Sequence, residues 1–520
     1  MGAILGRLAF LLAFAPFLQG VIGRTKAIAA GRTGPPLLQP YHDIWKLLRK
    51  GAVYSPVEGV LFRAGPTVGL ACALVAGLLV PLFDSKAPME FPGDVVLFAY
   101  LLGLGRFLTV LAALDTGSSF EGMGASRETA FSAVCESGLL LALAVLCLPG
   151  SVFSFAGAGA AVGGLIPHPA VLLAAAALFV VLLAENSRIP VDDPATHLEL
   201  TMIHEVMVLD HGGPDFAYIL LASAVKLFLM SAVLVRLLVP APAAATEATS
   251  AIFLATVLAV GVLVGIVEST MARLRLSRVP QLLFSATALA LIALAVLFHP
   301  TAGGWEAADA LLAAVLVLNL FIASSSRLTA CVQACGIQGA ALSALPLALH
   351  GVGRAATSVH PLAMAAGTFA LKAIAIPLLL LRAIREANVR REVEPSQSLT
   401  ASLLLGAVFT AISFSLGRVL VLPEASSSAL TVPAAFATML VGFLMLAGRR
   451  KAVAQVVGFL LLDNGVFVFA QALAREMPLV VELGILLDVL VGVFVMGIAI
   501  YHISREFDHI DTDELSTLRD

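Results

Sequence analysis

The sequence has too little charge for a soluble protein. Only 12% of its 520 residues are Asp, Glu, Lys or Arg, whereas an average soluble domain has roughly 25%. So few charged side chains cannot cover a surface that faces water, which excludes a soluble enzyme. The 31 basic and 34 acidic residues give a formal charge of -3, so no basic excess is available to bind a nucleic acid.

Cysteine is also scarce, and its spacing suits no metal centre. The five cysteines lie in apolar segments without any Cys-x-x-Cys pair, at Cys72, Cys135, Cys147, Cys331 and Cys335. This pattern supports neither a disulfide framework nor a zinc or iron–sulfur site. A zinc-protease helix is excluded as well, because Val208 stands where the second histidine after His204-Glu205 would be needed. We therefore expect this chain to bind no metal ion and no cofactor.

Apolar residues, in contrast, make up 60% of the chain. At roughly 20 residues per crossing, this is enough for about fifteen spans of a bilayer. The hydropathy pattern places them at 3–23, 66–84, 94–114, 130–149, 169–186, 216–239, 251–271, 281–299, 306–324, 328–349, 361–382, 400–422, 432–448, 452–474 and 479–502. We predict an all-α, polytopic membrane protein with about 15 transmembrane helices in two bundles. The first span has no small-residue cleavage site, so we expect it to be a helix and not a cleaved signal.

The distribution of basic residues predicts the orientation of the chain. If the N-terminus lies outside, 22 of the 31 Lys and Arg residues fall in inner loops or at their edges. The positive-inside rule then places the N-terminus outside and the C-terminus in the cytoplasm. Two of these inner loops, 24–65 and 187–215, are long, charged and interrupted by proline. We expect both to form a docking surface for a peripheral partner, with Arg32, Lys46, Arg127 and Arg188 as its basic residues.

Several charged residues lie within predicted spans, where each costs at least about 2.5–3.5 kcal/mol if it faces lipid. They are Glu136, Lys226, Glu268, Lys372, Asp463 and Asp488. For Glu268, and for Arg236 and Arg418, a structural role between helices or at a helix end is favoured. For Glu136, Lys372, Asp463 and Asp488 an ion path is favoured, because partly desolvated acids and lysines can exchange protons near neutral pH.

The loop from Glu185 to Glu205 is the most specific local pattern. It carries five acids, Glu185, Asp192, Asp193, Glu199 and Glu205, against a single Arg188. We expect a short helix from Glu199 to Glu205 at the membrane surface. An ordinary solvated loop is the alternative, but apolar residues interleaved with the acids favour packing against other elements.

Residues 1–300 resemble the subunit 1 family of complex I, in the version found in formate hydrogenlyase and hydrogenase-4-type complexes. The segments that carry this resemblance are Gly31-Arg-Thr-Gly-Pro35, Gln39 to Asp43 with Lys46, Gly124-Ala-Ser-Arg-Glu128, Ala184 to Glu205, and Arg273 to Pro280.

Residues 305–520 are similar to component E of hydrogenase-4, whose C-terminal part resembles the small antiporter-related subunit K of complex I. The segments concerned are Leu371-Lys-Ala-Ile-Ala-Ile-Pro377, Leu462-Asp-Asn-Gly465 and Val481 to Asp488. The family usually has Glu where this chain has Asp463, which retracts the carboxylate by one methylene. The two modules together indicate a fusion of neighbouring subunits.

These resemblances imply a membrane subunit of a bacterial or archaeal cell membrane that couples electron transfer to proton or sodium movement. They imply that it anchors peripheral hydrogenase-like large and iron–sulfur subunits, which hold the nickel–iron and iron–sulfur centres, and lies beside antiporter-like membrane subunits. Carried over residue by residue, the ion path begins at Glu136, Glu185, Asp192, Glu199 and Glu205 and continues through Lys372, Asp463, Glu482 and Asp488.

Two other functions fit parts of the sequence. A quinone-binding subunit of a respiratory NADH dehydrogenase-like complex would use the same loops around a quinone headgroup, but the component-E-like second half favours the hydrogenase-type assembly. A free-standing secondary transporter would show inverted repeats with broken helices, and these are not evident.

Overall fold

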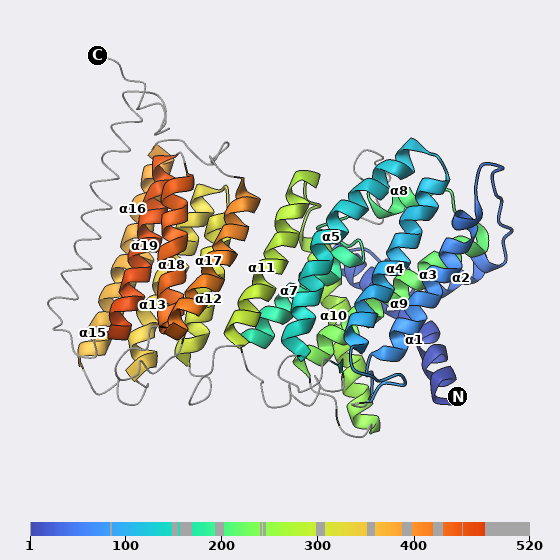
Figure 1. The fold of residues 1–520 in the computed structure, drawn as a ribbon, viewed down its shortest axis with the longest axis horizontal. Helices are drawn as coiled ribbons and strands as arrows, with labels where there is room; N and C mark the ends of the chain where they lie inside the picture. Colours follow the sequence, from blue (N-terminus) through green and yellow to red (C-terminus); the bar gives the residue numbers. More distant parts are fainter. Residues whose placement is uncertain are drawn as a thin grey trace, which may run out of the picture. The chain divides into compact units, whose positions relative to one another are not determined.

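The computed structural model describes residues 2–83, 86–147, 154–155, 169–192, 202–239, 242, 246–297, 307–350, 359–386, 398–419, 430–449 and 451–473. Every regular element in these ranges is a helix (Figure 1). In chain order they are α1 (Gly2–Ala29), α2 (Gln39–Leu48), α3 (Val60–Leu79), α4 (Asp94–Asp115), α5 (Ser119–Cys147), α7 (Pro169–Glu185), α8 (His204–Val208), α9 (Gly213–Leu238), α10 (Glu247–Thr270), η1 (Leu276–Arg278), α11 (Val279–Leu297), α12 (Ala307–Ser324), α13 (Leu328–His350), α15 (Val359–Thr368), η2 (Phe369–Ala375), α16 (Ile376–Glu386), α17 (Leu399–Val419), α18 (Thr431–Gly448) and α19 (Ala452–Leu473).

The apolar helices confirm the prediction of an all-α, multi-pass membrane protein. In the described residues, 12 helices are long and apolar enough to cross a bilayer, and two shorter apolar helices cover Ala170–Glu185 and Val453–Phe469. The expected count of about fifteen is consistent with this result, and the last predicted span, 479–502, lies outside the described residues.

The chain divides into two compact units, residues 1–293 and 294–520. The junction expected from the sequence, 300–305, falls in a stretch outside the described residues.

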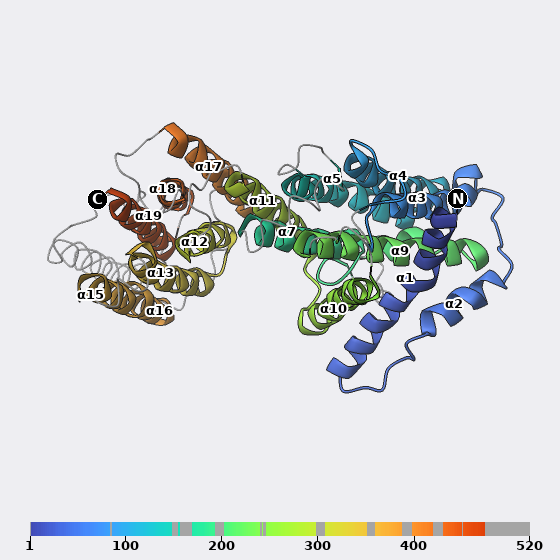
Figure 2. The same cartoon turned by 90° about the horizontal axis from the view of Figure 1, so that it is seen from below.

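Helix α9 is the central helix of the first unit. It packs against α1, α2, α3, α7 and α10, and Figure 2 shows it running between α3 and α4 on one side and α1 and α10 on the other. From Ala224 to Leu237 every residue except Lys226 is buried, as expected of a helix that is apolar all round. Arg236 is charged but is buried like its neighbours, because its guanidinium donates hydrogen bonds to the carbonyl oxygens of Pro81 and Leu82.

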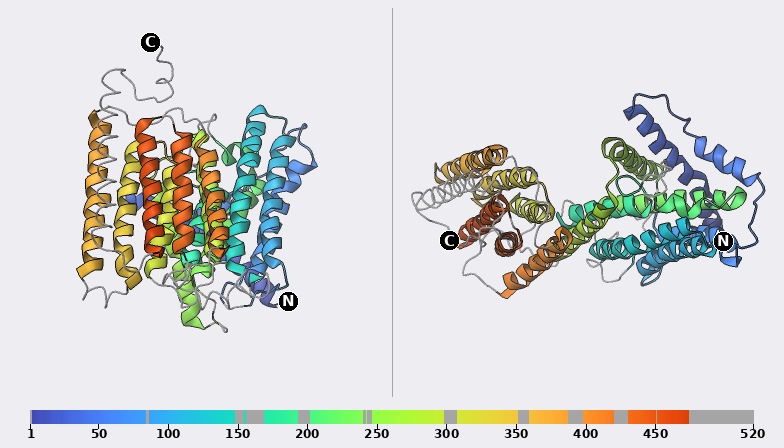
Figure 3. Two further views of the ribbon diagram at one scale, coloured as in Figure 1. Left: turned by 60° about the vertical axis from the view of Figure 1, so that its left-hand side comes forward. Right: turned by 90° about the horizontal axis from the view of Figure 1, so that it is seen from above.

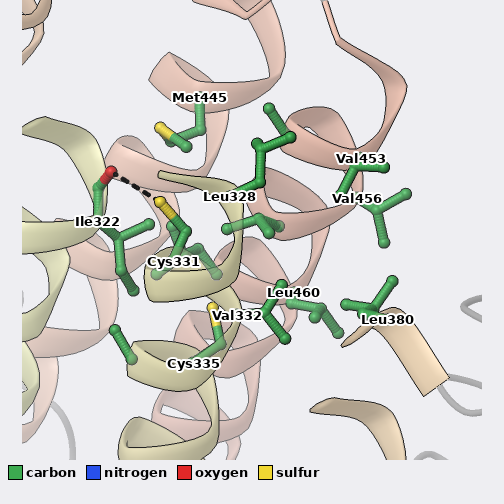
Figure 4. Packing of buried hydrophobic residues seen from close by; sticks show 14 of the residues in the cluster. Ile322, Leu328, Cys331, Val332, Cys335, Leu380, Met445, Val453, Val456 and Leu460 are labelled. Atoms are coloured by element: carbon green, nitrogen blue, oxygen red, sulfur yellow. Dashed lines mark hydrogen bonds between the residues drawn. The ribbon is translucent and has the colours of Figure 1, made fainter. Parts of the chain in front are cut away.

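In the second unit, helices α12, α13, α18 and α19 form the middle of the bundle (Figure 3). Helix α17 flanks them at one edge, and the continuous rod of α15, η2 and α16 flanks them at the other. Figure 4 shows the apolar cluster that joins α12, α13, α16, α18 and α19, with Cys331 and Cys335 among leucine and valine side chains. Both thiols are buried in this cluster, so they act as small apolar groups in the core.

The rod of α15, η2 and α16 contains a π-helical turn over Phe369–Ala375. Such turns are rare and frequently occur at functional sites. Gly339 of α13 lies directly against this turn, because a Cβ atom there would lie 2.7 Å from the carbonyl carbon and oxygen of Lys372. The absence of a side chain at Gly339 lets α13 approach the backbone that carries Lys372.

Candidate functional site

The first unit contains a buried carboxylate held between two cations from different helices. Glu185 ends α7, and its side chain is 3% exposed. Arg106 of α4 contacts one carboxylate oxygen, and Lys226 Nζ of α9 lies 2.8 Å from the other. Arg106 also lies 3.5 Å from Glu136 of α5. A buried charge is costly unless it is paired, so these contacts explain how four ionisable side chains are tolerated within the bundle.

A cavity with several ionisable side chains in its lining lies beside these ion pairs. It has a volume of about 90 Å³, and its lining includes Arg106, Glu128, Glu185, His204 and Lys226. This volume has room for several water molecules, and the lining offers them hydrogen-bond partners. We call Arg106, Glu128, Glu136, Glu185 and Lys226 the Glu185 cluster. Its three carboxylates outnumber its two cations, so the cluster is suited to take up one proton.

A smaller cavity of about 20 Å³ adjoins the same residues and extends to Asp192. Asp192 forms an ion pair with Arg273 at 2.8 Å and accepts the backbone N–H of His204 at 3.0 Å. Arg127 donates to the carbonyl oxygen of Met202 at 3.0 Å. These contacts fix the start of α8, which places His204 in the lining of the larger cavity. Burial lowers the pKa of His204 below its usual value, which favours the neutral imidazole there.

A second buried glutamate of this unit has a similar pair of cations but a different setting. Glu268 of α10 lies 2.9 Å from Lys26 of α1 and 3.5 Å from Arg188, which follows α7. Its side chain is 0% exposed, and it does not line either cavity described above. Glu268 therefore ties α1, α10 and the segment after α7 together, in line with the structural role inferred from the sequence.

An ion pair lies at the π-helical turn of the second unit. Lys372 Nζ of η2 lies 2.5 Å from Asp463 Oδ2 of α19, and it also donates to Asn464 Oδ1 at 2.9 Å. The ammonium group lies 4.9 Å from the ring centre of Phe467. The exposed fractions of the two charged side chains are only 5% and 12%. Lys372 and Asp463, which lie in two different predicted spans, are therefore ion-pair partners.

The structure brings some of the predicted ion-path residues together and leaves others apart. Glu136 and Glu185 share Arg106, and Lys372 and Asp463 form a pair. Asp192 joins the first group through the small cavity, and Glu205 lies in α8 next to His204. Glu199, Glu482 and Asp488 lie outside the described residues. The short helix predicted over 199–205 begins later than expected, because the described residues 202 and 203 are not helical and α8 runs from His204 to Val208.

The four predicted docking residues have different environments. Arg32 and Lys46 are exposed, as a docking role requires. Arg127 and Arg188 instead make contacts within the chain, to Met202 and Glu268 respectively. Arg127 of α5 thus holds the segment before α8, and Arg188 holds the segment after α7 against α10.

Sequence reasoning assigned no role to three members of the site. Arg106 and Lys226 are single cations within apolar spans, a position that marks them as candidate residues but does not identify Glu185 as their partner. Glu128 belongs to a quoted motif but was given no role. Across the described residues, no group of three or more His, Cys, Asp or Glu side chains is arranged to hold a metal ion.

Comparison with known proteins agrees with the two resemblances. Residues 2–299 match the family described as NADH dehydrogenase. Hydrogenase-4 component C of Escherichia coli is 34% identical over 297 residues, which cover 55% of this chain and 93% of that protein. Formate hydrogenlyase subunit 4 of E. coli is 29% identical over 296 residues, 54% of this chain and 94% of that protein. Hydrogenase-4 component E of E. coli matches a separate region and is 27% identical over 157 residues, 30% of this chain and 71% of that protein.

Proposed function

The chain belongs to the NADH dehydrogenase family, and on this premise we propose that it is a membrane subunit of an energy-converting, hydrogenase-like complex. Its role there is to anchor a peripheral redox arm and to couple electron transfer to the movement of protons or sodium ions. Two relatives carry the names of hydrogenase-4 components and a third that of a formate hydrogenlyase subunit, which supports this type of complex.

The Glu185 cluster is the observation that carries the proposal. An energy-coupling subunit needs titratable groups inside the bilayer, held by partners and reached by water. Glu185, Arg106 and Lys226 meet the first requirement, and the cavity of about 90 Å³ beside them meets the second. Because one more carboxylate than cation belongs to the cluster, a proton can bind there without leaving an unpaired positive charge.

The partners follow from the same proposal. Peripheral hydrogenase-like large and iron–sulfur subunits hold the redox centres, and antiporter-like membrane subunits carry the ion path onward. The loops 24–65 and 187–215 form the docking surface on the cytoplasmic side, and the exposed Arg32 and Lys46 support the first of them. The excess of Lys and Arg in the inner loops supports an outer N-terminus and a cytoplasmic C-terminus.

The test compares two buried glutamates that each contact two cations. The intact complex is reconstituted in liposomes, electron transfer is driven by reduced methyl viologen, and uptake of protons and of sodium ions is followed with separate dyes. Glu185→Gln is expected to lower the ions moved per electron. Glu268→Gln, the matched control, is expected to lower only the amount of assembled complex, because Glu268 lines neither cavity of the Glu185 cluster. Equal effects of both variants on the ratio of ions to electrons contradict the proposed role of Glu185.

A quinone-binding subunit is the second candidate, and one surface feature favours it. A more open hollow of about 500 Å³ is lined by Tyr100, Phe107, Arg106 and Glu136. This volume lies within the roughly 300–1,000 Å³ of small-molecule pockets, whereas the cavity at Glu185 is smaller. A photoreactive quinone that labels Tyr100 or Phe107 in the intact complex, and is displaced by excess quinone, would support this candidate over the first.

A further inference from the structure

A continuous chain of hydrogen bonds leads from Lys372 across the second unit. Lys372 donates to Asn464 Oδ1 at 2.9 Å, and Asn464 Nδ2 donates to Gln338 Oε1 at 3.3 Å. Gln338 Nε2 donates to Asn319 Oδ1 at 2.8 Å, and Asn319 Nδ2 donates to Thr438 Oγ1 at 2.8 Å. We call Asn464, Gln338, Asn319 and Thr438 the polar chain. Its members come from four helices, α19, α13, α12 and α18, which lie side by side in the middle of the unit (Figures 1 and 2).

The polar chain lies in an apolar environment. Gln338 and Thr438 are 0% exposed, Asn319 is 1% exposed and Asn464 is 4% exposed. The apolar cluster of Figure 4 occupies the same helices, and aliphatic side chains at these positions would pack without any need for hydrogen bonds. A buried polar network is tolerated only if every member is satisfied, and it then fixes one arrangement of the helices and side chains. The hydrogen bonds of the polar chain therefore hold its four side chains in defined orientations.

All the hydrogen bonds of the chain run in one direction. Each amide accepts with its carbonyl oxygen on the side of Lys372 and donates with its N–H group on the far side. The last donor, the hydroxyl of Thr438, gives its hydrogen to the carbonyl oxygen of Ala434 at 2.7 Å. The aligned amide dipoles thus present their negative ends to the ammonium group, and each bond polarises the next.

The polar chain does not conduct protons along its length. Asn and Gln side chains donate and accept hydrogen bonds but do not ionise. A proton passed to an amide oxygen would have to leave from the amide nitrogen, which gives an imidic acid that must then revert. The polar chain is consequently suited to hold a side chain in place. Gln338, Asn319 and Thr438 hold the side chain of Asn464, which contacts Lys372.

We propose that Gln338 and Asn319 are positioning residues for the Lys372–Asp463 pair. They keep the carbonyl oxygen of Asn464 directed at Lys372, so that the ammonium group retains an acceptor when Asp463 is neutralised. In that step a hydronium ion in the ion path transfers its proton to the Asp463 carboxylate, where an O–H bond forms and a water molecule is left. The ion pair with Lys372 is lost while the hydrogen bond of Lys372 to Asn464 remains. When the pair forms again, the O–H bond on Asp463 breaks and the proton passes to a water molecule further along the ion path, so nothing else is consumed. This inference rests on the proposed function.

The test uses the intact complex in liposomes and measures ions moved per electron, normalised to assembled complex. Gln338→Leu is expected to lower this ratio several-fold. Gln338→Glu, whose protonated carboxyl keeps both an acceptor and a donor, is expected to restore it to within about twofold. Gln333→Leu is the matched control, because Gln333 is exposed on the same helix and is expected to leave the ratio unchanged.

The outcomes separate the inference from its premise. If Lys372→Met leaves the ratio unchanged, the pair is not on the ion path and the proposed function fails at this point. If Lys372→Met lowers the ratio and Gln338→Leu lowers only the amount of assembled complex, the polar chain has a structural role and the inference alone is wrong. If Gln338→Leu does not assemble, Asn319→Leu/Gln338→Leu removes both partners of the central bond and is measured in its place. A normal ratio in that double variant also overturns the inference.

Discussion

Separating Lys372 from its partner is expected to destabilise the second unit more than the small change in shape suggests. Asp463→Asn keeps the size of the side chain but leaves a buried ammonium without its counter-ion. Removal of one partner from a buried pair costs about 3–5 kcal/mol. The contacts of Lys372 with Asn464 at 2.9 Å and with the ring of Phe467 at 4.9 Å remain and offset part of this cost. We therefore expect a value near the lower end, about 3 kcal/mol.

A double-mutant cycle measures whether the two charges act as a pair. Lys372→Met is expected to cost a similar amount, because it leaves the Asp463 carboxylate in the same apolar surroundings. The double variant Lys372→Met/Asp463→Asn removes both charges, and its cost is expected to be well below the sum of the single costs. The midpoint of thermal unfolding of the purified complex in detergent gives the stabilities, and the yield of assembled complex gives an independent measure.

Ion uptake by the same variants tests the role of the pair. All three are expected to move fewer ions per electron, and the double variant is expected to do so while it assembles almost normally. If the free-energy cost of the double variant equals the sum of the two single costs, Lys372 and Asp463 do not interact. A normal ratio of ions to electrons in a well-assembled double variant would show that the pair is structural.

Two further predictions concern the orientation of the chain and its response to pH. Ala245→Cys is expected to react with an impermeant thiol reagent from outside only and Val393→Cys from inside only, and the opposite labelling would refute the topology. Burial lowers the pKa of His204, so at pH values below about 6.5 the unfolded chain binds a proton at this residue more readily than the folded chain does. The free energy of unfolding therefore has its full value, as far as His204 is concerned, above the unfolded pKa of about 6.5 and decreases as the pH falls below it. The thermal midpoint of His204→Gln should accordingly fall less between pH 7 and pH 5 than that of the unchanged chain, and identical slopes would contradict the assignment.

The helical architecture could be predicted from the sequence because the bilayer imposes it. Within a membrane every backbone polar group must be bonded within its own segment, so a run of apolar residues such as 216–239 predicts a helix directly. The same constraint makes charges within spans informative, and for this reason Glu136, Lys372 and Asp463 could be selected as candidate residues.

The pairing of these charges could not be predicted, because it depends on which helices are neighbours. Arg106 and Glu185 are 79 positions apart, and Lys372 and Asp463 are 91 positions apart. Nothing in either local pattern states that α4 faces the end of α7, or that η2 faces α19. The polar chain was missed for a different reason, since a single Gln or Asn in an apolar span carries no charge and does not stand out as Lys372 does.

The two charged sites differ in how they can handle a proton, and this difference assigns them different tasks on the proposed path. The Glu185 cluster has three carboxylates and two cations, so one added proton improves its balance. The Lys372–Asp463 pair is already balanced, so a proton can bind to Asp463 only if the pair separates. The first site is therefore suited to store a proton, whereas the second changes its internal contacts each time it is occupied. Asn464 provides the acceptor that such a change requires, which is why the polar chain belongs to the second site.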